Sequence, residues 1–505
     1  MATLPDMAEP EESGGEAMSD DELVSILSAH ASQAIGYQSG DDITAEQERA
    51  LNYYNRIMDD VPAAEGTSSV VDGTVALVID NGLASVLRPF VSSDETVRFV
   101  ARQEEDIEYA EQATEYVNYI FNCDNPGFMI LHDWFKDGLL TKLGIVKVWW
   151  EDRARTDKQV IQPQDDLHAQ FLRNQQGYLG EDEGGIHIGQ EINDGRVKIC
   201  NVPPEEFRIS PLSRTVADAI YVAHVPTNVT RSDLVEMGFD PEIVEGLPAY
   251  SGGEENTLAD ARRADENYEN TMPVSAHASQ DVMALRDEYI RVDYDDDGIA
   301  EIRRVMRVGD VILLNEEAEE NPFASVCPIP MPHKVFGLSL ADLAVQEQRI
   351  STVLWRQTLD NLYKSNNPRP IVGEGALMSD GSTGDTLSDN APGAAVMVKD
   401  ASQFRFDAVP FTAQHSMPMM EMVAQRVEEM TGVSRAGQGL DTNAIRSAGQ
   451  TTATEMAMVQ GGKNARMEMV ARIFAETGVK RLFELVLKLV TKQIGRASCR
   501  ERVSS

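Results

Sequence analysis

Cysteine is scarce in this chain, which has four of them among 505 residues. They stand at positions 123, 200, 327 and 499, and no two of them form a CxxC pair. A disulfide framework or a cysteine-based zinc site needs closely patterned cysteines. The sequence therefore argues against a disulfide-stapled domain and favours reduced thiols.

Basic residues are also few. The chain has 44 lysines and arginines against 83 aspartates and glutamates, so its formal net charge is −39. A protein that wraps nucleic acid neutralises phosphates with a basic face. This chain is therefore not expected to grip nucleic acid, although its acidity is compatible with DNA that slides past it.

Long apolar runs are missing. The most apolar window, residues 75–87, contains an aspartate and is shorter than the roughly 18 uncharged residues that a membrane span needs. Residues 1–19 are acidic and have no apolar core, so they predict a disordered tail and no signal peptide. We expect no membrane association.

Catalytic motifs are missing as well. The eight histidines show neither HExxH spacing nor an i, i+4 pair. The stretch "QGGKN" resembles a phosphate loop, but Ala457 replaces its first glycine and Asn464 its serine or threonine. His132 and Asp133 are adjacent, and a surface or half-buried pair accounts for them better than a catalytic dyad. We therefore expect no enzymatic activity, no catalytic residue and no cofactor.

A chain of this length exceeds one compact core, and we expect two to four domains. Hydrophobic periodicity predicts an α+β fold that is mainly helical. Helices are predicted at 20–36, 44–58, 69–88 (ending at Pro89), 104–122, 127–142, 339–365, 416–431 and, with glycine interruptions that include Gly478, 449–493. Strands are predicted at 95–102 and 144–151 and in a meander over 286–315, and a mobile loop is predicted at 245–280.

The stretch "RVDYDDDGIAEIRR" (291–304) places Asp293, Asp295 and Asp297 just before Gly298, as in the first half of an EF-hand calcium loop. The twelfth position of such a loop needs a bidentate glutamate, and here it holds Arg304. The flanking segments are strand-like, so we interpret the stretch as a β-turn in which aspartate accepts backbone hydrogen bonds. A weak calcium site at the three aspartates stays an alternative, because a cation would relieve the repulsion between their carboxylates.

Methionine is concentrated in the second half of the chain. The residues are Met417, Met419, Met420, Met422, Met430, Met456, Met458, Met467 and Met469. Such flexible side chains either fill a core or form an adaptable interface between helices of neighbouring subunits. Both interpretations stay open.

The last residues, "IGRASCRERVSS" (494–505), break the preceding pattern abruptly. They match the translation of a common sequencing adapter, and we expect them to be an artefact, with the natural chain continuing past Gln493.

Several longer stretches resemble the portal proteins of tailed bacteriophages, the head–tail connectors, most closely those of short-tailed phages. The resemblance rests mainly on "PHKVFGLSLADLAVQEQRISTVLWRQTLDNLYKSNNPRPIV" (332–372), "TGVSRAGQGLDTNAIRS" (431–447) and "ARIFAETGVKRLFELVLKLV" (471–490). Segments 68–90, 116–151 and 202–211 are similar to the N-terminal region of that family. The resemblance thus covers most of residues 20–493.

The resemblance implies a division of the chain into portal domains. These are a wing at 20–330, a first stem helix at 331–365, a clip at 366–411, a second stem helix at 412–432, a channel loop at 433–448 and a kinked helix at 449–493 that leads into a crown. A ring of copies would explain why the stem helices have little apolar cover within one chain.

The resemblance also implies a function. The protein would form a dodecameric ring at one capsid vertex of the virion, after synthesis in the host cytoplasm, and double-stranded DNA would be packaged and ejected through it. Expected partners are further copies of the chain, the terminase large subunit, major capsid and scaffolding proteins, and tail adaptor proteins. Candidate residues of the channel loop are Arg435, Gln438, Asn443 and Arg446, and an ordinary solvated loop is an equal alternative for each of them. The alternatives are another virion ring or tail adaptor protein, and a calcium-dependent binding module.

Overall fold

The computed structural model describes residues 18–36, 42–92, 95–151, 154–161, 178–182, 185–193, 195–249, 257–262, 277–377, 383, 397–407, 409–433 and 465–503. Helix and strand are mixed, and helix is the larger share, at 51% against 18% strand, so the predicted α+β, mainly helical class is confirmed. The chain divides into two units. The first unit consists of Met1–Glu48, Gly82–Ser339 and Met467–Ser505, and the second of Arg49–Asn81 and Leu340–Arg466.

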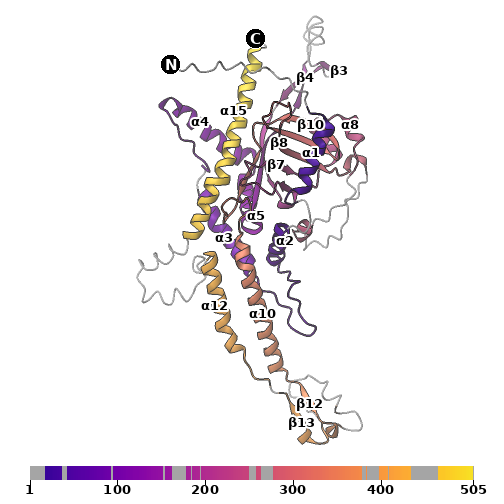
Figure 1. Cartoon of the computed structure of the whole chain (residues 1–505), viewed down its shortest axis with the longest axis vertical. Helices are drawn as coiled ribbons and strands as arrows, with labels where there is room; N and C mark the ends of the chain where they lie inside the picture. Colours follow the sequence, from indigo (N-terminus) through magenta and orange to yellow (C-terminus); the bar gives the residue numbers. More distant parts are fainter. Residues whose placement is uncertain are drawn as a thin grey trace, which may run out of the picture. The chain divides into compact units, whose positions relative to one another are not determined.

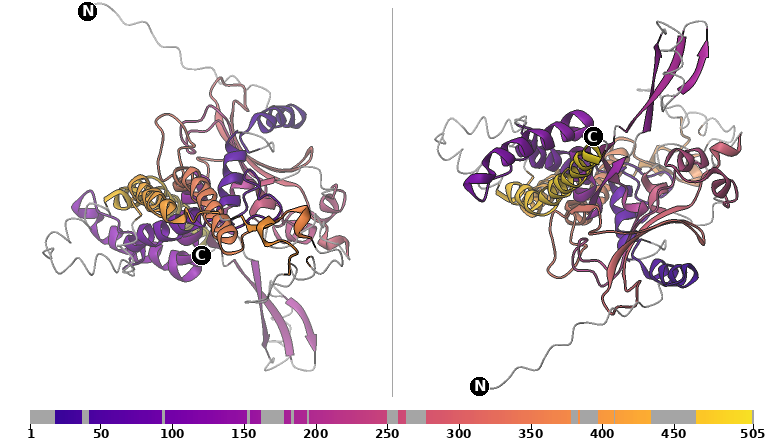
Figure 2. Two further views of the ribbon diagram at one scale, coloured as in Figure 1. Left: turned by 90° about the horizontal axis from the view of Figure 1, so that it is seen from below. Right: turned by 90° about the horizontal axis from the view of Figure 1, so that it is seen from above.

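The first unit contains three antiparallel sheets (Figures 1 and 2). A three-stranded sheet has the order β11 (Phe323–Val326), β1 (Gly144–Glu151), β5 (Arg196–Val202). A five-stranded sheet has the order β10 (Val311–Glu317), β9 (Glu301–Val308), β8 (Leu285–Val292), β7 (Tyr221–His224), β6 (Phe207–Ile209). Figure 2 shows the third sheet as a group of long ribbons, with the order β2 (Ala154–Ile161), β4 (Gly185–Asn193), β3 (Tyr178–Asp182).

The core of this unit follows from the two-residue period of the strands. Val222 of β7 packs with Ile145 of β1 in one buried cluster, so the five-stranded and three-stranded sheets share a core. Its neighbours in the strand, Tyr221 and Ala223, point the other way and pack against helix α1 (Asp20–Gln33). Helices α7 (Arg231–Glu236) and α8 (Pro241–Glu245) cover a further cluster around Met306 and Val308 of β9.

A helical layer packs beside the three-stranded sheet. It contains α4 (Ile107–Tyr119), α5 (Gly127–Thr141) and α15 (Lys480–Val503), with π-helical segments at Ile120–Asp124 and Ala475–Val479. Phe135 of α5 and Phe474 lie with ring centroids 4.9 Å apart, and Phe121 and Phe483 lie 5.1 Å apart. Gly478 takes part in the π-helical segment, where a Cβ atom would be 2.4 Å from Val326 Cγ1 of β11. The interruption expected at this glycine is therefore a π turn that allows close helix–strand approach.

The second unit is built on two helices that run side by side (Figure 1). Helix α10 (Leu340–Asn366) lies close to the predicted 339–365, and α12 (Ala413–Thr431) ends, as predicted, at Gly432, whose φ is 76°. Between them, β12 (Pro370–Val372) pairs with β13 (Phe404–Phe406). Helix α2 (Asp42–Tyr54) leads into this unit, and α3 (Thr74–Val91) is shared by both.

Three expectations are corrected by the structure. Residues 95–102 form no strand, because Asn118 Oδ1 accepts from Thr96 N and Val97 N and Thr114 Oγ1 accepts from Phe99 N in place of strand partners. The region 245–280 is not loop throughout. It contains helix α9 (Thr257–Arg262), in which Leu258 is buried and Arg262 pairs with Asp137 and Glu205.

Helix α3 is the third correction. It passes Pro89 and ends at Val91, because Leu87 and Phe90 on either side of the proline are buried and their packing favours the helical path. The helix is long and apolar enough to cross a membrane by length and composition, and 44% of its apolar window is buried. The apolar stretch is thus longer than residues 75–87 suggested, and a buried core helix has the same composition.

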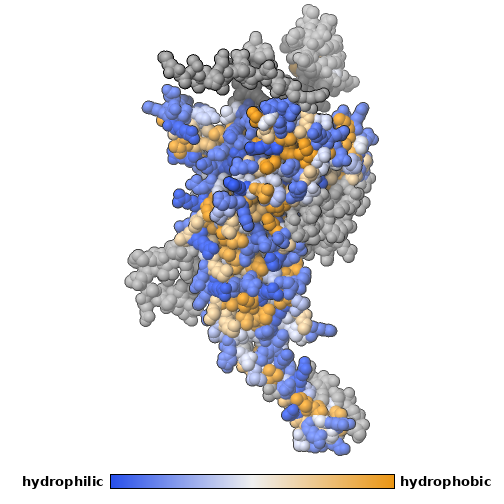
Figure 3. Space-filling model, in the orientation of Figure 1, coloured by the Kyte–Doolittle hydropathy of each residue, from blue (hydrophilic) through white to orange (hydrophobic). Residues whose placement is uncertain are grey.

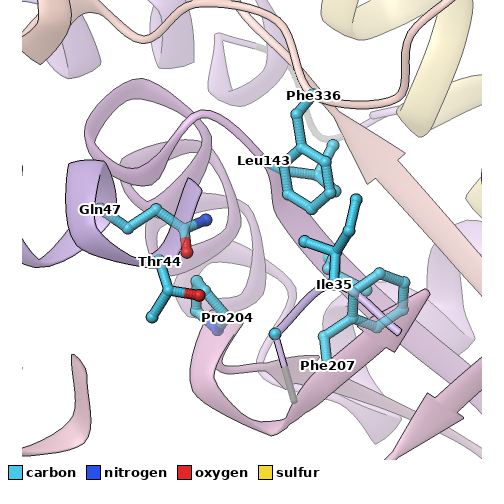
Figure 4. A pocket seen from close by; sticks show the side chains of 9 residues that line it. Ile35, Thr44, Gln47, Leu143, Pro204, Phe207 and Phe336 are labelled. Atoms are coloured by element: carbon cyan, nitrogen blue, oxygen red, sulfur yellow. The ribbon is translucent and has the colours of Figure 1, made fainter. Parts of the chain in front are cut away.

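A small cavity in the first unit lies between Ile35, Thr44, Gln47, Leu143 and Phe207 (Figure 4). Its volume of about 10 Å³ corresponds to about one water molecule. The Gln47 side chain donates to Thr141 O at 2.8 Å at this site. The cavity is therefore a packing feature and too small for an organic ligand.

Buried charge joins the five-stranded sheet to the three-stranded sheet that contains β1. Lys147 Nζ of β1 lies 2.5 Å from Asp287 Oδ2 of β8, and Arg304 Nε of β9 lies 3.1 Å from Asp287 Oδ1. Burial alone would raise the pKa of Asp287, but the charges of Lys147 and Arg304 outweigh it and lower the pKa from 3.8 to about 2. The carboxylate is therefore charged in the folded protein down to low pH.

We predict that Asp287→Asn lowers the free energy of unfolding by about 3–5 kcal/mol near neutral pH, because it leaves Lys147 buried beside a neutral partner. The folded-state pKa of Asp287 lies below the unfolded value, so its contribution is complete above pH 3.8 and is lost as the pH falls toward 2. Urea unfolding of the wild type and the variant over this pH range measures the difference, which should shrink with acidification. Glu319→Gln, which removes a surface pair with Lys492, is the control and should leave the urea midpoint unchanged. A difference that does not vary with pH would contradict the assignment.

Candidate functional site

Helix α10 holds an extended segment of the second unit through a row of polar side chains. Gln348 is completely buried, its Oε1 accepts from Val75 N at 2.7 Å, and its Nε2 donates to Tyr53 O at 2.9 Å. One amide side chain therefore satisfies the backbone at both ends of the segment between α2 and α3.

The same face of α10 continues this row toward the helix C-terminus. Thr352 Oγ1 accepts from Asp72 N at 3.1 Å. Arg356 donates to Val70 O at 2.9 Å and to Val61 O at 2.5 Å. Asp360 Oδ1 accepts from Ser68 N at 2.7 Å. A spacing of four residues places all four side chains on one helix face, so segment 53–75 receives from α10 the partners that it lacks in a sheet or helix.

This row was missed in the sequence analysis. The sequence does show the pattern of this row, which is polar residues at 348, 352, 356 and 360 within an otherwise amphipathic helix. Polar residues on a helix surface usually face water, so the spacing alone gave no reason to place a second segment against them.

A second set of polar contacts ties α10 to α12. Glu347 is 2% exposed and its Oε1 accepts from Arg426 Nε at 3.1 Å. Thr358 Oγ1 lies 2.9 Å from Ser416 Oγ. Asn361 donates to Pro410 O and accepts from Thr412 N, so it fixes the start of α12. These contacts extend along the helix pair and set its register.

Helix α12 is poorly covered by its own unit. Among its described residues, 414–431, only Val427 and Thr431 are buried. Met417, Met419 and Met422 are 58%, 53% and 67% exposed. Figure 3 shows hydrophobic surface along this helix pair. Exposed methionine in this amount is typical of an adaptable binding surface rather than of a filled core, so these residues favour the interface interpretation.

A groove follows one side of α12. It has a volume of about 690 Å³ and lies between α12, the first turns of α3, and Ser351 and Trp355 of α10. Met417, Met420, Ala424 and Val427 line its α12 wall, at the i, i+3, i+7, i+10 spacing of a helix–helix seam. The opposite wall includes Leu77, which is 47% exposed. The groove thus has an apolar seam along α12, and no helix among the described residues packs into it.

The strand pair β12–β13 forms a small hairpin-like tip between α10 and α12. Asp407 N donates to Arg369 O and Gly373 N donates to Gln403 O, both at 2.8 Å, so the pairing extends beyond the strands. Phe404 and Phe406 pack edge to face, yet Phe406 is 53% exposed. This tip therefore presents apolar side chains on its surface.

The predicted channel-loop residues Arg435, Gln438, Asn443 and Arg446 lie outside the described residues. The three predicted metal ligands are described, and the turn brings their carboxylate oxygens within 4.8 Å of one another.

The predicted turn is the connection between β8 and β9. Asp293 accepts from Asp297 N at 3.1 Å and from Gly298 N at 2.8 Å, and the φ of Gly298 is 85°. Arg304 is directed to Asp287 and Glu316 instead of the turn. The turn interpretation is therefore confirmed by its hydrogen bonds, in which Asp293 and Asp297 accept from backbone amides.

Comparison with protein families shows that residues 23–499 match the family model described as phage SU10 portal protein. The matched range begins within α1 and ends within α15, so it includes both units. A search among curated proteins finds no significant match.

We predict that Gln348→Leu loosens segment 53–75, because it removes the side-chain acceptor of Val75 N and leaves Tyr53 O with Arg56 N as its remaining donor among the described residues. Local stability should fall by about 2 kcal/mol, which is about a thirtyfold rise in amide exchange. Hydrogen exchange followed by mass spectrometry measures the change over this segment. Gln357→Leu is the matched control, because Gln357 is exposed on the same helix. Equal exchange in the two variants would contradict the role of Gln348.

We predict that calcium binds the turn at Asp293–Asp297 no more tightly than about 1 mM, since two backbone amides already use the Asp293 carboxylate and Arg304 replaces the bidentate glutamate. Titration calorimetry with calcium, on the wild type and on Asp295→Ala, measures this. Tight binding that Asp295→Ala abolishes would instead establish a calcium site.

Proposed function

The chain belongs to the phage SU10 portal protein family, and on this premise we propose that it assembles with copies of itself into a dodecameric ring at one vertex of the capsid. Proteins of this family are structural components of the phage particle and not enzymes. The ring would serve as the conduit for double-stranded DNA during packaging and ejection.

The observation that carries this proposal is the incomplete cover of the helix pair α10–α12. Helix α12 exposes Met417, Met419 and Met422, and the groove beside it has an apolar seam along α12 and no occupant among the described residues. Copies arranged in a ring would cover such faces against one another. We assign α10 and α12 to the stem and β12–β13 to the clip.

The charge of the chain suits a conduit. A strongly basic channel would retain DNA through many phosphate contacts, whereas a chain with net charge −39 offers few such contacts and lets DNA slide. Residues Arg435, Gln438, Asn443 and Arg446 are proposed for the loop that faces the DNA. Their mixture of two arginines with two amides would give weak, sequence-independent contacts.

The remaining partners follow from the same assignment. The terminase large subunit would dock on the clip during packaging, and tail adaptor proteins, of a short-tailed phage, would replace it afterwards. The exposed Phe406 and Ile371 of the clip support a docking role. The wing, residues 20–330, would face the major capsid and scaffolding proteins.

Another ring or tail adaptor protein of the virion is the second candidate, because an exposed helix seam serves any ring. The calcium-dependent module is not favoured, because Arg304 stands where a calcium loop needs its bidentate glutamate.

We predict that the purified 505-residue chain forms rings of twelve 55.7 kDa copies with a central channel. Native mass spectrometry gives the copy number and negative-stain images give the ring. A dilution series is the control, since a specific ring dissociates into one small species whereas an aggregate does not. A monomer at all concentrations would refute the proposal, and a ring with a different copy number and no channel would favour the adaptor protein.

A further inference from the structure

Helix α4 presents a face that its core packing leaves exposed. The residues of α4 that pack inward are Ala110, Ala113, Thr114, Val117 and Asn118. On the other side, Tyr109, Tyr116 and Tyr119 are 54%, 47% and 56% exposed. Together with the exposed Gln112, they follow the i, i+3, i+7, i+10 spacing of a helix–helix seam. We call these four residues the tyrosine row.

The tyrosine row has an acidic border. Glu108 and Glu115 are exposed and come directly before Tyr109 and Tyr116, so the heptad spacing places both glutamates on one edge of the row. The sequence around α4 offers no cation of its own, because residues 103–135 contain eight aspartates and glutamates and no lysine or arginine. The face is therefore both aromatic and negatively charged.

Helix α15 lies beside α4 and borders the row at Tyr109, whose Oη lies 3.2 Å from Thr491 Oγ1 (Figures 1 and 2). The lysines on either side of Thr491 have other partners. Lys488 pairs with Glu320 and Lys492 pairs with Glu319, in the connection that precedes β11. These two lysines are therefore engaged by carboxylates outside α4.

Charge decides which class of ligand this face fits. Nucleic acid would bring phosphates against Glu108 and Glu115 and would be repelled. The α4 helix of a second copy would bring the same carboxylates and would be repelled as well. A partner helix with an apolar stripe and with arginine or lysine along its edges matches both features of the face. Its apolar stripe covers the tyrosine rings, and its cations pair with the glutamates or lie over the ring faces.

We propose that the tyrosine row of α4 is a docking surface for a basic amphipathic helix of a partner protein. In the complex, cationic side chains of the partner lie next to Glu108 and Glu115, and its apolar stripe packs on Tyr116 and Tyr119. The inference goes beyond the proposed ring, because α4 belongs to the first unit and the surface is complete within one copy. It gives the first unit a partner of defined chemistry.

A synthetic peptide tests the surface on the 505-residue chain. The probe is a fluorescent helical peptide with leucine at the a and d positions of a heptad repeat and arginine at e and g. Fluorescence anisotropy measures its dissociation constant at about 0.15 M salt, where distant charges are screened. The double variant Glu108→Lys with Glu115→Lys should bind the peptide about tenfold more weakly or worse, because it places like charges together.

The matched control is Glu236→Lys with Glu245→Lys. It makes the same change of net charge at two exposed glutamates of the first unit, on α7 and α8, and should leave the dissociation constant unchanged. Tyr116→Ala is an uncharged variant that should weaken binding by about fivefold, whereas Tyr116→Phe keeps the ring and should bind as the wild type does. Circular dichroism melting of each variant separates loss of binding from loss of folding.

The outcomes separate this inference from the proposed function. Equal weakening by the control pair, or equal binding of a peptide with glutamate in place of arginine, would overturn the docking surface. Binding that disappears at concentrations where the chain forms rings would also overturn it, because a neighbouring copy would then cover the face. Binding through the tyrosine row by a chain that forms no rings would overturn the proposed ring and leave this inference standing.

Discussion

The second unit depends on one constraint, which is that the backbone of a non-helical segment must find hydrogen-bond partners away from any sheet. Residues 53–75 join α2 to α3 beside α10, and Gln348, Thr352, Arg356 and Asp360 bond their backbone groups. Without these partners, the segment would have to turn its polar groups to water. That would remove the start of α3 from its place beside α10, and with it one wall of the groove.

Helix α10 thus makes different contacts with three of its faces, which the helical periodicity separates. One face holds segment 53–75, a second contacts α12 through Glu347, Thr358 and Asn361, and a third, around Val353, is partly exposed. A helix of 27 residues is long enough to repeat each face over several turns. Its low overall hydrophobicity follows, because two of its faces work through polar contacts.

Much of the fold was predictable, and particular residues show why the rest was not. Strand β1 matched its predicted range because its burial is nearly continuous. Helix α12 ended as predicted because the backbone at Gly432 has a positive φ, which glycine adopts most easily. Residues 95–102 alternate as a strand does, yet Asn118 and Thr114, on a helix later in the chain, take their backbone bonds. Such tertiary partners leave no local pattern. The turn at Asp293 was recognised because Arg304 conflicted with a calcium loop, whereas the groove needs residues from three helices and has no signature in any one of them.

Acidity poses a problem for any assembly of identical chains, because every copy repels the next over distances up to about a Debye length. A ring is stable only where close contacts outweigh this repulsion, so its interfaces must be apolar or must pair unlike charges. Helix α12 supplies an apolar seam at Met417, Met420, Ala424 and Val427 in a chain that has 83 acidic residues. This seam is therefore a place where copies can meet. In the proposed conduit, the rest of the acidic surface would keep DNA from being held.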